Sequence, residues 1–120
     1  MTRPVYELKA EFFKTLGHPA RIRILEVLRD GEASVADIAE AVGVSGSTLS
    51  QHLATLRRAD VISSRRDGSQ LIYQVVDPRV FQLLQIGREI LTSTLEGSRE
   101  LLDDLAKLRL DHDEHGSAVG

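Results

Sequence analysis

The sequence contains no cysteine. This absence excludes disulfide bonds, thiol redox sensing, thiolate metal sites and a cysteine nucleophile. Only three Phe and two Tyr are present, so we expect a core of aliphatic side chains. No apolar run approaches the roughly 18–20 residues of a membrane-spanning helix, and the first ten residues lack the apolar core of a signal peptide. We therefore expect a cytoplasmic protein that does not contact a membrane.

An excess of basic residues is also missing, because the 120 residues carry a net charge of −3. The charge is unevenly distributed. Residues 1–79 contain 11 basic and 10 acidic side chains, a net charge of +1, whereas residues 80–120 contain 4 and 8, a net charge of −4. Within residues 57–66 there are four arginines against one aspartate. A nucleic-acid site needs local positive potential rather than a basic total, so the acidic total does not exclude DNA binding.

The length and composition suit a single globular domain, because 42% of the residues are hydrophobic and 28% are charged. We expect this domain to span residues 1–110. Residues 111–120 are polar and end in small residues, which predicts a flexible tail.

Four amphipathic helices are predicted in the first half of the chain from the spacing of apolar residues. The first helix covers residues 5–16. Turns at residues 17–19, 30–31 and 43, each containing glycine, separate the four helices. Ser34 is expected to cap the third helix, because an aspartate three residues later gives a variant of the capping box.

A β-hairpin and a long helix follow. Two alternating runs, at residues 61–66 and 70–76, flank Asp67-Gly68, which is a strong signal for a tight hairpin. Asp77-Pro78 introduces a helix over residues 79–109, whose leucines repeat at near-heptad spacing. The predicted fold is therefore mainly α with a small β-hairpin. In this winged helix-turn-helix, the third and fourth helices form the helix-turn-helix and the hairpin is the wing.

The fourth helix lies in residues 45–58, SGSTLSQHLATLRR, and Ser45 or Ser47 can cap it. A helical projection separates an apolar side from a polar side. The apolar residues that would face the core are Leu49, Leu53 and Leu56. The opposite side of the first two turns carries short, uncharged, hydrogen-bonding side chains and no acid. This composition suits insertion into a major groove about 12 Å wide.

Contacts with DNA are predicted on this helix and on the hairpin. Serine and threonine bond phosphates and base edges, and Gln51 can make a bidentate contact to adenine. The hairpin arginines would reach flanking phosphates or the minor groove. The alternative is a solvent-facing helix that merely lacks charge. The residues expected to contact DNA are Ser47, Thr48, Ser50, Gln51, Thr55, Arg58, Arg65 and Arg66.

Two histidines are expected to have structural roles rather than to bind DNA or metal. His52 falls at the border between the apolar and polar sides of the fourth helix, where a packed, hydrogen-bonded side chain is more common than one that reads a base. His18 lies in a Gly-His-Pro turn between the first two helices and is expected to support that turn.

Three long stretches carry a family resemblance: LGHPARIRILEVL (16–28), SVADIAEAVGVSGSTLSQHLATLRRADVI (34–62) and RRDGSQLIYQV (65–75). In order and spacing they resemble the ArsR/SmtB winged-helix repressors. The resemblance implies a homodimeric transcriptional regulator that acts as a repressor. It also implies that the first and fifth helices form the dimer interface, and that the two recognition helices read an inverted-repeat operator in double-stranded DNA.

The resemblance also assigns individual positions. The residues that match the family's DNA-contacting positions are Ser47, Thr48, Ser50 and Gln51, and those that match the wing are Arg65, Arg66 and Gly68. Many family members sense metal ions, and here the sequence departs from the pattern. The Cys pair of one family site is replaced by Ser34 and Ala36. A second site uses Asp, His, His and His or Glu, and the matching residues are Asp77, Arg79, Ile90 and Ser93. Both sites are therefore expected to be lost.

The C-terminal segment carries the remaining candidate for a metal site. Asp111, His112 and His115 offer carboxylate and imidazole ligands that suit nickel or zinc. The two histidines can bind one ion if the last helix extends that far. The alternative is a solvated acidic tail.

Two other functions compete with direct DNA regulation. One is a protein-interaction module in which the last helix and acidic tail bind a partner. The other is a partner-dependent regulator, which needs a co-regulatory protein because it has no effector site of its own. The four arginines at residues 57, 58, 65 and 66 favour DNA binding over the interaction module. The sequence contains no Walker loop and no GxGxxG motif, and a Ser/His/Asp set can be assembled only with residues of the fourth helix. We therefore expect that the protein is not an enzyme.

Overall fold

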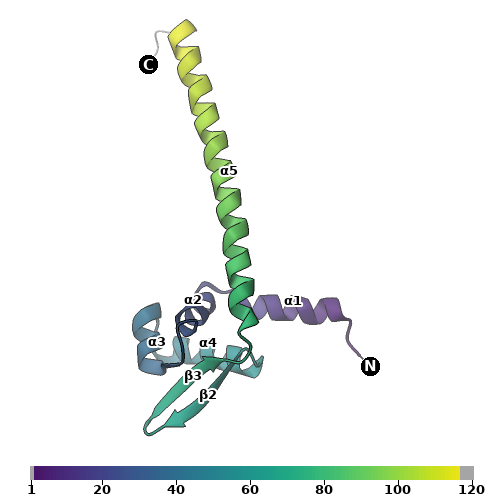
Figure 1. Cartoon of the computed structure of the whole chain (residues 1–120), viewed down its shortest axis with the longest axis vertical. Coiled ribbons are helices and arrows are strands. Elements are labelled where there is room, and N and C mark those ends of the chain that lie inside the picture. Colours follow the sequence, from purple (N-terminus) through teal and green to yellow (C-terminus); the bar gives the residue numbers. More distant parts are fainter. Residues whose placement is uncertain (1, 117–120) are drawn as a thin grey trace. The chain divides into compact units, whose positions relative to one another are not determined.

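The computed structural model describes residues 2–116, and the side chains of residues 2–108 (Figure 1). It divides into two units, residues 1–82 and residues 83–120. The elements, in chain order, are α1 (Val5–Leu16), α2 (Pro19–Leu28), β1 (Ala33–Ser34), α3 (Val35–Val42), α4 (Gly46–Arg58), β2 (Ile62–Asp67), β3 (Gln70–Val75) and α5 (Arg79–Gly116). The predicted fold class, a mainly helical winged helix-turn-helix, is confirmed.

Local capping explains where α2 begins and where α3 begins and ends. His18 is the N-cap of α2, and its Nδ1 accepts a hydrogen bond from the backbone N–H of Ala20 at 3.1 Å. Ser34 caps α3, because its Oγ accepts from the backbone N–H of Asp37 at 3.1 Å. The α3 helix ends at Gly43, whose φ of 77° lies in the left-handed region that glycine tolerates. The structural roles predicted for His18 and Ser34 are confirmed.

The α4 helix begins differently. Ser45 holds the N-cap position in an extended conformation, but its side chain makes no capping hydrogen bond. Ser47 lies inside the helix. Ser45 is therefore the N-cap residue, as predicted, but its hydroxyl does not make the expected capping hydrogen bond. The first backbone N–H groups of α4 remain available for other acceptors.

The wing is a three-stranded antiparallel sheet in the order β1-β3-β2. The register places Asp67 opposite Gln70, so the hairpin loop is Gly68-Ser69 rather than the predicted Asp67-Gly68. Gly68 has a φ of 64°, which explains why a glycine occupies this loop. The β1 strand pairs Ala33 and its neighbour with β3 and was not predicted, because two residues are too few to show alternation.

A small aliphatic core lies in the first unit. The buried hydrophobic side chains are Leu16, Ile24, Leu25, Leu28, Ile38, Leu49, Leu53, Leu56, Val61, Ile62, Tyr73 and Val80. Tyr73 is the one aromatic residue among them, as the scarcity of aromatics led us to expect. The predicted apolar stripe of α4 is fully represented in this core. Its burial fixes α4 on the first unit and leaves the opposite side of the helix exposed.

The second unit consists of the greater part of α5, which continues to Gly116 instead of ending near residue 109. Residues 98–115 contain neither glycine nor proline, so nothing in the sequence ends the helix earlier. The domain boundary at residue 110 stays a prediction. Among the described residues, no helix is both long and apolar enough to cross a membrane.

Candidate nucleic-acid interface

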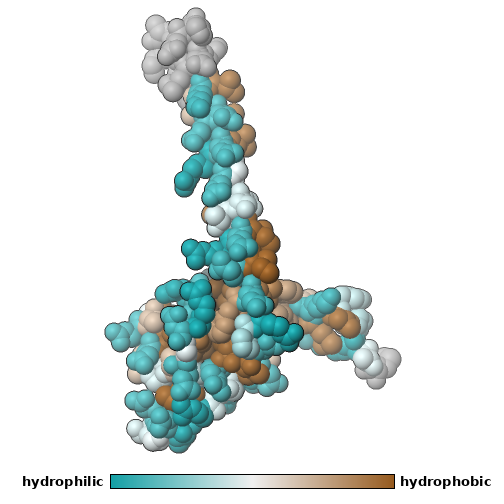
Figure 2. Space-filling view, viewed as in Figure 1, coloured by the Kyte–Doolittle hydropathy of each residue, from teal (hydrophilic) through white to brown (hydrophobic). Residues whose placement is uncertain are grey.

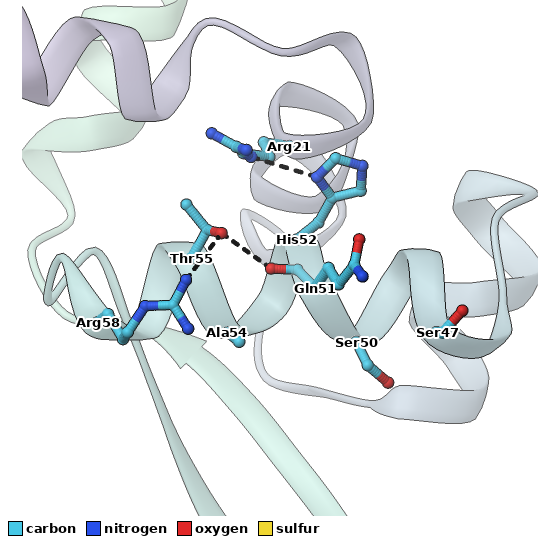
Figure 3. A pocket seen from close by; sticks show the side chains of 8 residues that line it. All are labelled: Arg21, Ser47, Ser50, Gln51, His52, Ala54, Thr55 and Arg58. Atoms are coloured by element: carbon cyan, nitrogen blue, oxygen red, sulfur yellow. Dashed lines mark hydrogen bonds between the residues drawn. The ribbon is translucent and has the colours of Figure 1, made fainter.

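The exposed side of α4 forms an open hollow of about 620 Å³ (Figure 3). Five of the residues predicted to contact DNA line it: Ser47, Ser50, Gln51, Thr55 and Arg58. Three further residues complete the lining: Arg21, His52 and Ala54. The lining thus combines hydroxyl and amide groups with two guanidinium groups and contains no carboxylate. Such a surface can bind an anion that also offers hydrogen-bonding edges.

The hydroxyl of Thr55 is already engaged within α4. Its Oγ1 donates to the backbone oxygen of Gln51 at 2.9 Å and accepts from Nη2 of Arg58 at 3.4 Å (Figure 3). In the described structure no hydrogen bond involves the side-chain atoms of Ser47, Ser50 or the amide of Gln51. These three side chains are therefore better placed to bind a partner than Thr55.

Thr48 lies on α4 and is exposed, but it is not among the residues that line the hollow. Its neighbours Ser47 and Ser50 do line it. The structure therefore brings together most of the residues predicted on α4 and leaves Thr48 beside them.

His52 is a half-buried, hydrogen-bonded residue, as predicted. Its Nδ1 accepts from Nε of Arg21 at 3.2 Å. Its ring lies against the ring of His18, with 4.3 Å between the centroids and a tilt of 45°. Burial, and then the nearby His18 and Arg21, lower the pKa of His52 below its ordinary value. The lowered pKa favours the neutral imidazole, and the hydrogen bond from Arg21 places its proton on Nε2, so that Nδ1 accepts.

Arg21 was missed by the sequence reasoning. It comes from the first turn of α2 and points toward His52 (Figure 3). Its Nη1 donates to the backbone oxygen of Thr15 at 3.0 Å. One sequence signal was available. An arginine within three residues of Pro19 places a cation near the positive end of the α2 dipole, which is unfavourable by itself. Such a residue needs a compensating interaction.

The arginines of the wing differ from one another. Arg65 forms an ion pair with Glu32, in the turn before β1, and has Asp67 at 4.0 Å. This pairing raises the pKa of Arg65. Arg66 instead lines a second hollow, of about 440 Å³, together with the first residues of α3. Arg57 donates to Oγ of Ser64 at 3.3 Å and so connects α4 to β2.

Two of the four positions that match the family's second metal site, Asp77 and Arg79, form an ion pair. Nη2 of Arg79 lies 2.6 Å from Oδ2 of Asp77. The hydrogen bonds from Arg79 lower the pKa of Asp77 to about 2. The guanidinium thus takes up the carboxylate that a metal ion would need. No cluster of three or more potential metal ligands occurs among the described side chains. The side chains of Asp111, His112 and His115 lie outside the described residues.

Comparison with known proteins gives consistent results. The family model for bacterial regulatory proteins of the arsR family matches residues 18–64. The uncharacterized HTH-type transcriptional regulator Rv0081 of Mycobacterium tuberculosis is 48% identical over 105 residues, which are 87% of this chain and 92% of the relative. Its crystal structure has a TM-score of 0.74 to this one and covers 81% of this chain and 98% of that chain.

Two further solved structures are similar. The transcriptional repressor BigR from Xylella fastidiosa is 33% identical, with a TM-score of 0.63 over 75% of this chain and 96% of that chain. The homodimeric winged helix-turn-helix DNA-binding domain of Mb0332 from Mycobacterium bovis is 30% identical. Its TM-score is 0.64 over 71% of this chain and 82% of that chain.

Proposed function

Since the chain belongs to the arsR family of bacterial regulatory proteins and is a transcriptional regulator, we propose that it acts as a homodimer on an inverted-repeat DNA operator and represses transcription. The observation that carries this proposal is the hollow on α4, in which hydroxyls, an amide and guanidinium groups gather without a carboxylate. A DNA groove presents the complementary surface, namely phosphates at its margins and donor and acceptor edges on its floor.

Within this proposal the α4 residues divide into two roles. Ser47, Ser50 and Gln51 contact base edges and nearby phosphates, and the glutamine amide has the geometry to pair with adenine. Arg58, at the end of the helix, neutralises a phosphate. Thr48 takes a contact beside the hollow, and Thr55 supports Gln51 and Arg58 through its internal hydrogen bonds.

The wing supplies the remaining predicted contacts. Arg66 is exposed and is the wing arginine best placed to bind phosphate. Arg65 reaches DNA only by leaving Glu32 or by sharing its guanidinium with it. We therefore assign Arg66 the larger electrostatic contribution of the two.

The homodimer is supported by hydrophobic surfaces that a monomer leaves exposed. Figure 2 shows hydrophobic side chains on α1 and along α5. On α1 the exposed large hydrophobic residues are Val5, Tyr6, Leu8, Phe12 and Phe13. Exposed apolar surface of this extent marks an interaction site, and the similar domain from Mycobacterium bovis is a homodimer. A two-fold symmetric dimer presents two copies of α4, which matches an inverted repeat.

Repression is supported by the similarity to the transcriptional repressor BigR. The effector is a separate question. A nickel or zinc site at Asp111, His112 and His115 stays a prediction, and so does a co-regulatory protein. Calorimetry with Ni²⁺ and Zn²⁺ on the full chain and on a chain ending at Leu110 tests the metal site, because equal affinities would eliminate it.

Binding of the protein to its own promoter DNA at increasing salt tests the proposal. Affinity should fall steeply with salt if phosphates are neutralised. Gln51→Ala should lose about 1–3 kcal/mol of discrimination at its base pair, whereas Gln82→Ala removes the same amide outside the hollow and should bind like the wild type. The absence of any complex at low salt, or equal sequence preference in the two variants, would refute the assignment of α4 as the reading helix.

A further inference from the structure

We propose that Arg21 is a DNA-backbone contact, held by His52 and Thr15 so that its guanidinium binds a phosphate at the margin of the groove that α4 enters. This inference rests on the proposed function, because it requires α4 to face DNA. It adds a contact from α2, an element to which neither the sequence nor the comparisons assign a role in binding.

The first step is the position of Arg21. It lines the same hollow as Ser47, Ser50, Gln51 and Arg58, although it lies on a different helix (Figure 3). A helix inserted in the major groove has the phosphate backbone at its sides, and neighbouring elements cross that backbone. A cation at the edge of the α4 surface is therefore placed for a phosphate rather than for a base.

The second step is the fixation of the guanidinium. Nε of Arg21 donates to His52 at 3.2 Å, and Nη1 donates to the oxygen of Thr15 at 3.0 Å. Nη2 enters no hydrogen bond among the described residues. A guanidinium has five N–H donors in a planar fork, so two donors hold the side chain and others remain for a phosphate. Because the rotamer is fixed in advance, little conformational entropy is lost when the phosphate binds.

The third step is the absence of a competing anion. Some other arginines of the first unit have acidic partners, namely Arg23 with Glu26 and Arg65 with Glu32. In the described residues Arg21 has no carboxylate within ion-pair distance, and its two acceptors are a neutral imidazole and a carbonyl. The full positive charge of Arg21 is therefore available to an external anion.

His52 is accordingly a positioning residue. Its lone pair at Nδ1 directs Nε of Arg21, and the ring of His18 packs against its own ring. The imidazole thus connects α2 to the side of α4 that lines the hollow. His52→Asn keeps an acceptor near the place of Nδ1, whereas His52→Ala removes it.

The test compares Arg21→Gln with Arg29→Gln, which removes the same charge from the exposed far end of α2. Arg21→Gln should weaken binding by the same factor on the operator and on unrelated DNA, and the slope of log affinity against log salt should become shallower by about 0.9. Arg29→Gln should leave the slope unchanged. Equal slopes in the two variants would overturn the proposal and leave Arg21 with a structural role only.

Two further variants guard against a loss of folding. If Arg21→Gln does not fold, Arg21→Lys and Arg29→Lys carry the comparison. Lysine keeps the charge but cannot hold Thr15, His52 and a phosphate together, so only Arg21→Lys should bind all DNA several-fold more weakly. His52→Asn should retain more affinity than His52→Ala at equal thermal stability. Equal DNA affinities of Arg21→Lys and Arg29→Lys, or of His52→Asn and His52→Ala, would contradict the proposed roles of Arg21 and His52.

The outcome for the wild-type chain separates this inference from the proposed function. If the wild type binds no DNA, the proposed function fails. If the wild type binds with a steep salt dependence and Gln51→Ala loses sequence preference, but Arg21→Gln and Arg29→Gln behave alike, only the role of Arg21 fails.

Discussion

The positive charge of Arg65, on the wing, is already paired with a carboxylate of the same chain before any partner binds. Its guanidinium is paired with Glu32, and both side chains are about half exposed. An exposed pair of this kind contributes little to stability. It does, however, lower the positive potential that the wing offers to DNA, because the carboxylate competes with a phosphate for the same guanidinium. Glu32 therefore limits how strongly Arg65 contributes to binding.

We predict that Glu32→Gln raises affinity for all DNA sequences alike. The freed Arg65 gains a phosphate contact, so the slope of log affinity against log salt should steepen by up to about 0.9. Thermal stability should change little, because the lost pair is exposed. Fluorescence anisotropy with operator and unrelated duplexes over a salt series measures both quantities.

Glu26→Gln is the matched control, since Glu26 forms an ion pair with Arg23 on α2 and its loss changes the net charge equally. A general effect of charge would strengthen DNA binding to the same extent in both variants. In that case Arg65 would not be withheld from DNA by Glu32.

At the level of elements, two serines in N-cap positions differ in what their side chains do. The hydroxyl of Ser34 is buried and accepts from the backbone N–H of Asp37, whereas the side chain of Ser45 makes no such bond. The N-termini of α3 and α4, the two helices of the helix-turn-helix, are therefore stabilised to different extents. Of the two, only α3 has a side-chain cap.

We predict that Ser34→Ala lowers the free energy of unfolding by about 1 kcal/mol, within the range of roughly 0.5–2 kcal/mol found for lost N-caps. For a unit of this size the melting temperature should fall by roughly 4–8 °C per kcal/mol. Ser45→Ala should change the free energy of unfolding by less than about 0.5 kcal/mol. Urea denaturation of both variants measures the free energy of unfolding. Equal decreases in the two variants would mean that the hydrogen bond of Ser34 makes no net contribution to stability.

The elements were predictable where the physical cause is local. Periodicity placed α1 and the apolar stripe of α4, and capping chemistry placed the start of α3, because all of these signals lie within a few residues. The strand β1 could not be predicted, since its two residues become a strand only by pairing with β3. The hairpin was placed correctly, but its loop was shifted by one residue, because Asp67-Gly68 and Gly68-Ser69 are both compatible with a tight turn.

In the candidate site, too, the features with a local cause were predictable and those with a tertiary cause were not. Ser47, Ser50 and Gln51 were found because one helix determines which way they face. Arg21 was not found, because its partner His52 is 31 residues away in the sequence. The pairing of Arg65 with Glu32, 33 residues apart, escaped for the same reason. Side chains that meet through the tertiary fold require the structure.

At the scale of the whole molecule, α5 has two chemically different sides. A helical projection groups five of its leucines on one side: Leu84, Leu91, Leu95, Leu102 and Leu105. The opposite side carries Glu89, Glu96, Glu100 and Asp103. In the single chain Leu91 and Leu95 are 63% and 67% exposed. An exposed leucine stripe of this length marks a surface that another apolar surface can cover.

We predict that Leu95→Glu converts the proposed homodimer into monomers. Burial of a leucine is worth about 1.5–3 kcal/mol, and the two-fold symmetry of a dimer applies the loss twice. The dissociation constant of the dimer should therefore rise about a hundredfold or more. Because Leu95 is exposed in the single chain, the first unit should keep its fold and melt as a monomer. Analytical ultracentrifugation across a concentration series measures the change.

Ser93→Glu is the matched control, because it adds the same charge two residues away on the opposite side of α5 and should leave the dimer intact. Affinity for DNA should change with the oligomeric state. Leu95→Glu should bind a half-site and the full inverted repeat with similar, weak affinity. Ser93→Glu should prefer the full repeat. Identical sedimentation of the two variants would show that the leucine stripe does not form the dimer interface. The exposed apolar surface of α1 would then have to form the interface without this part of α5.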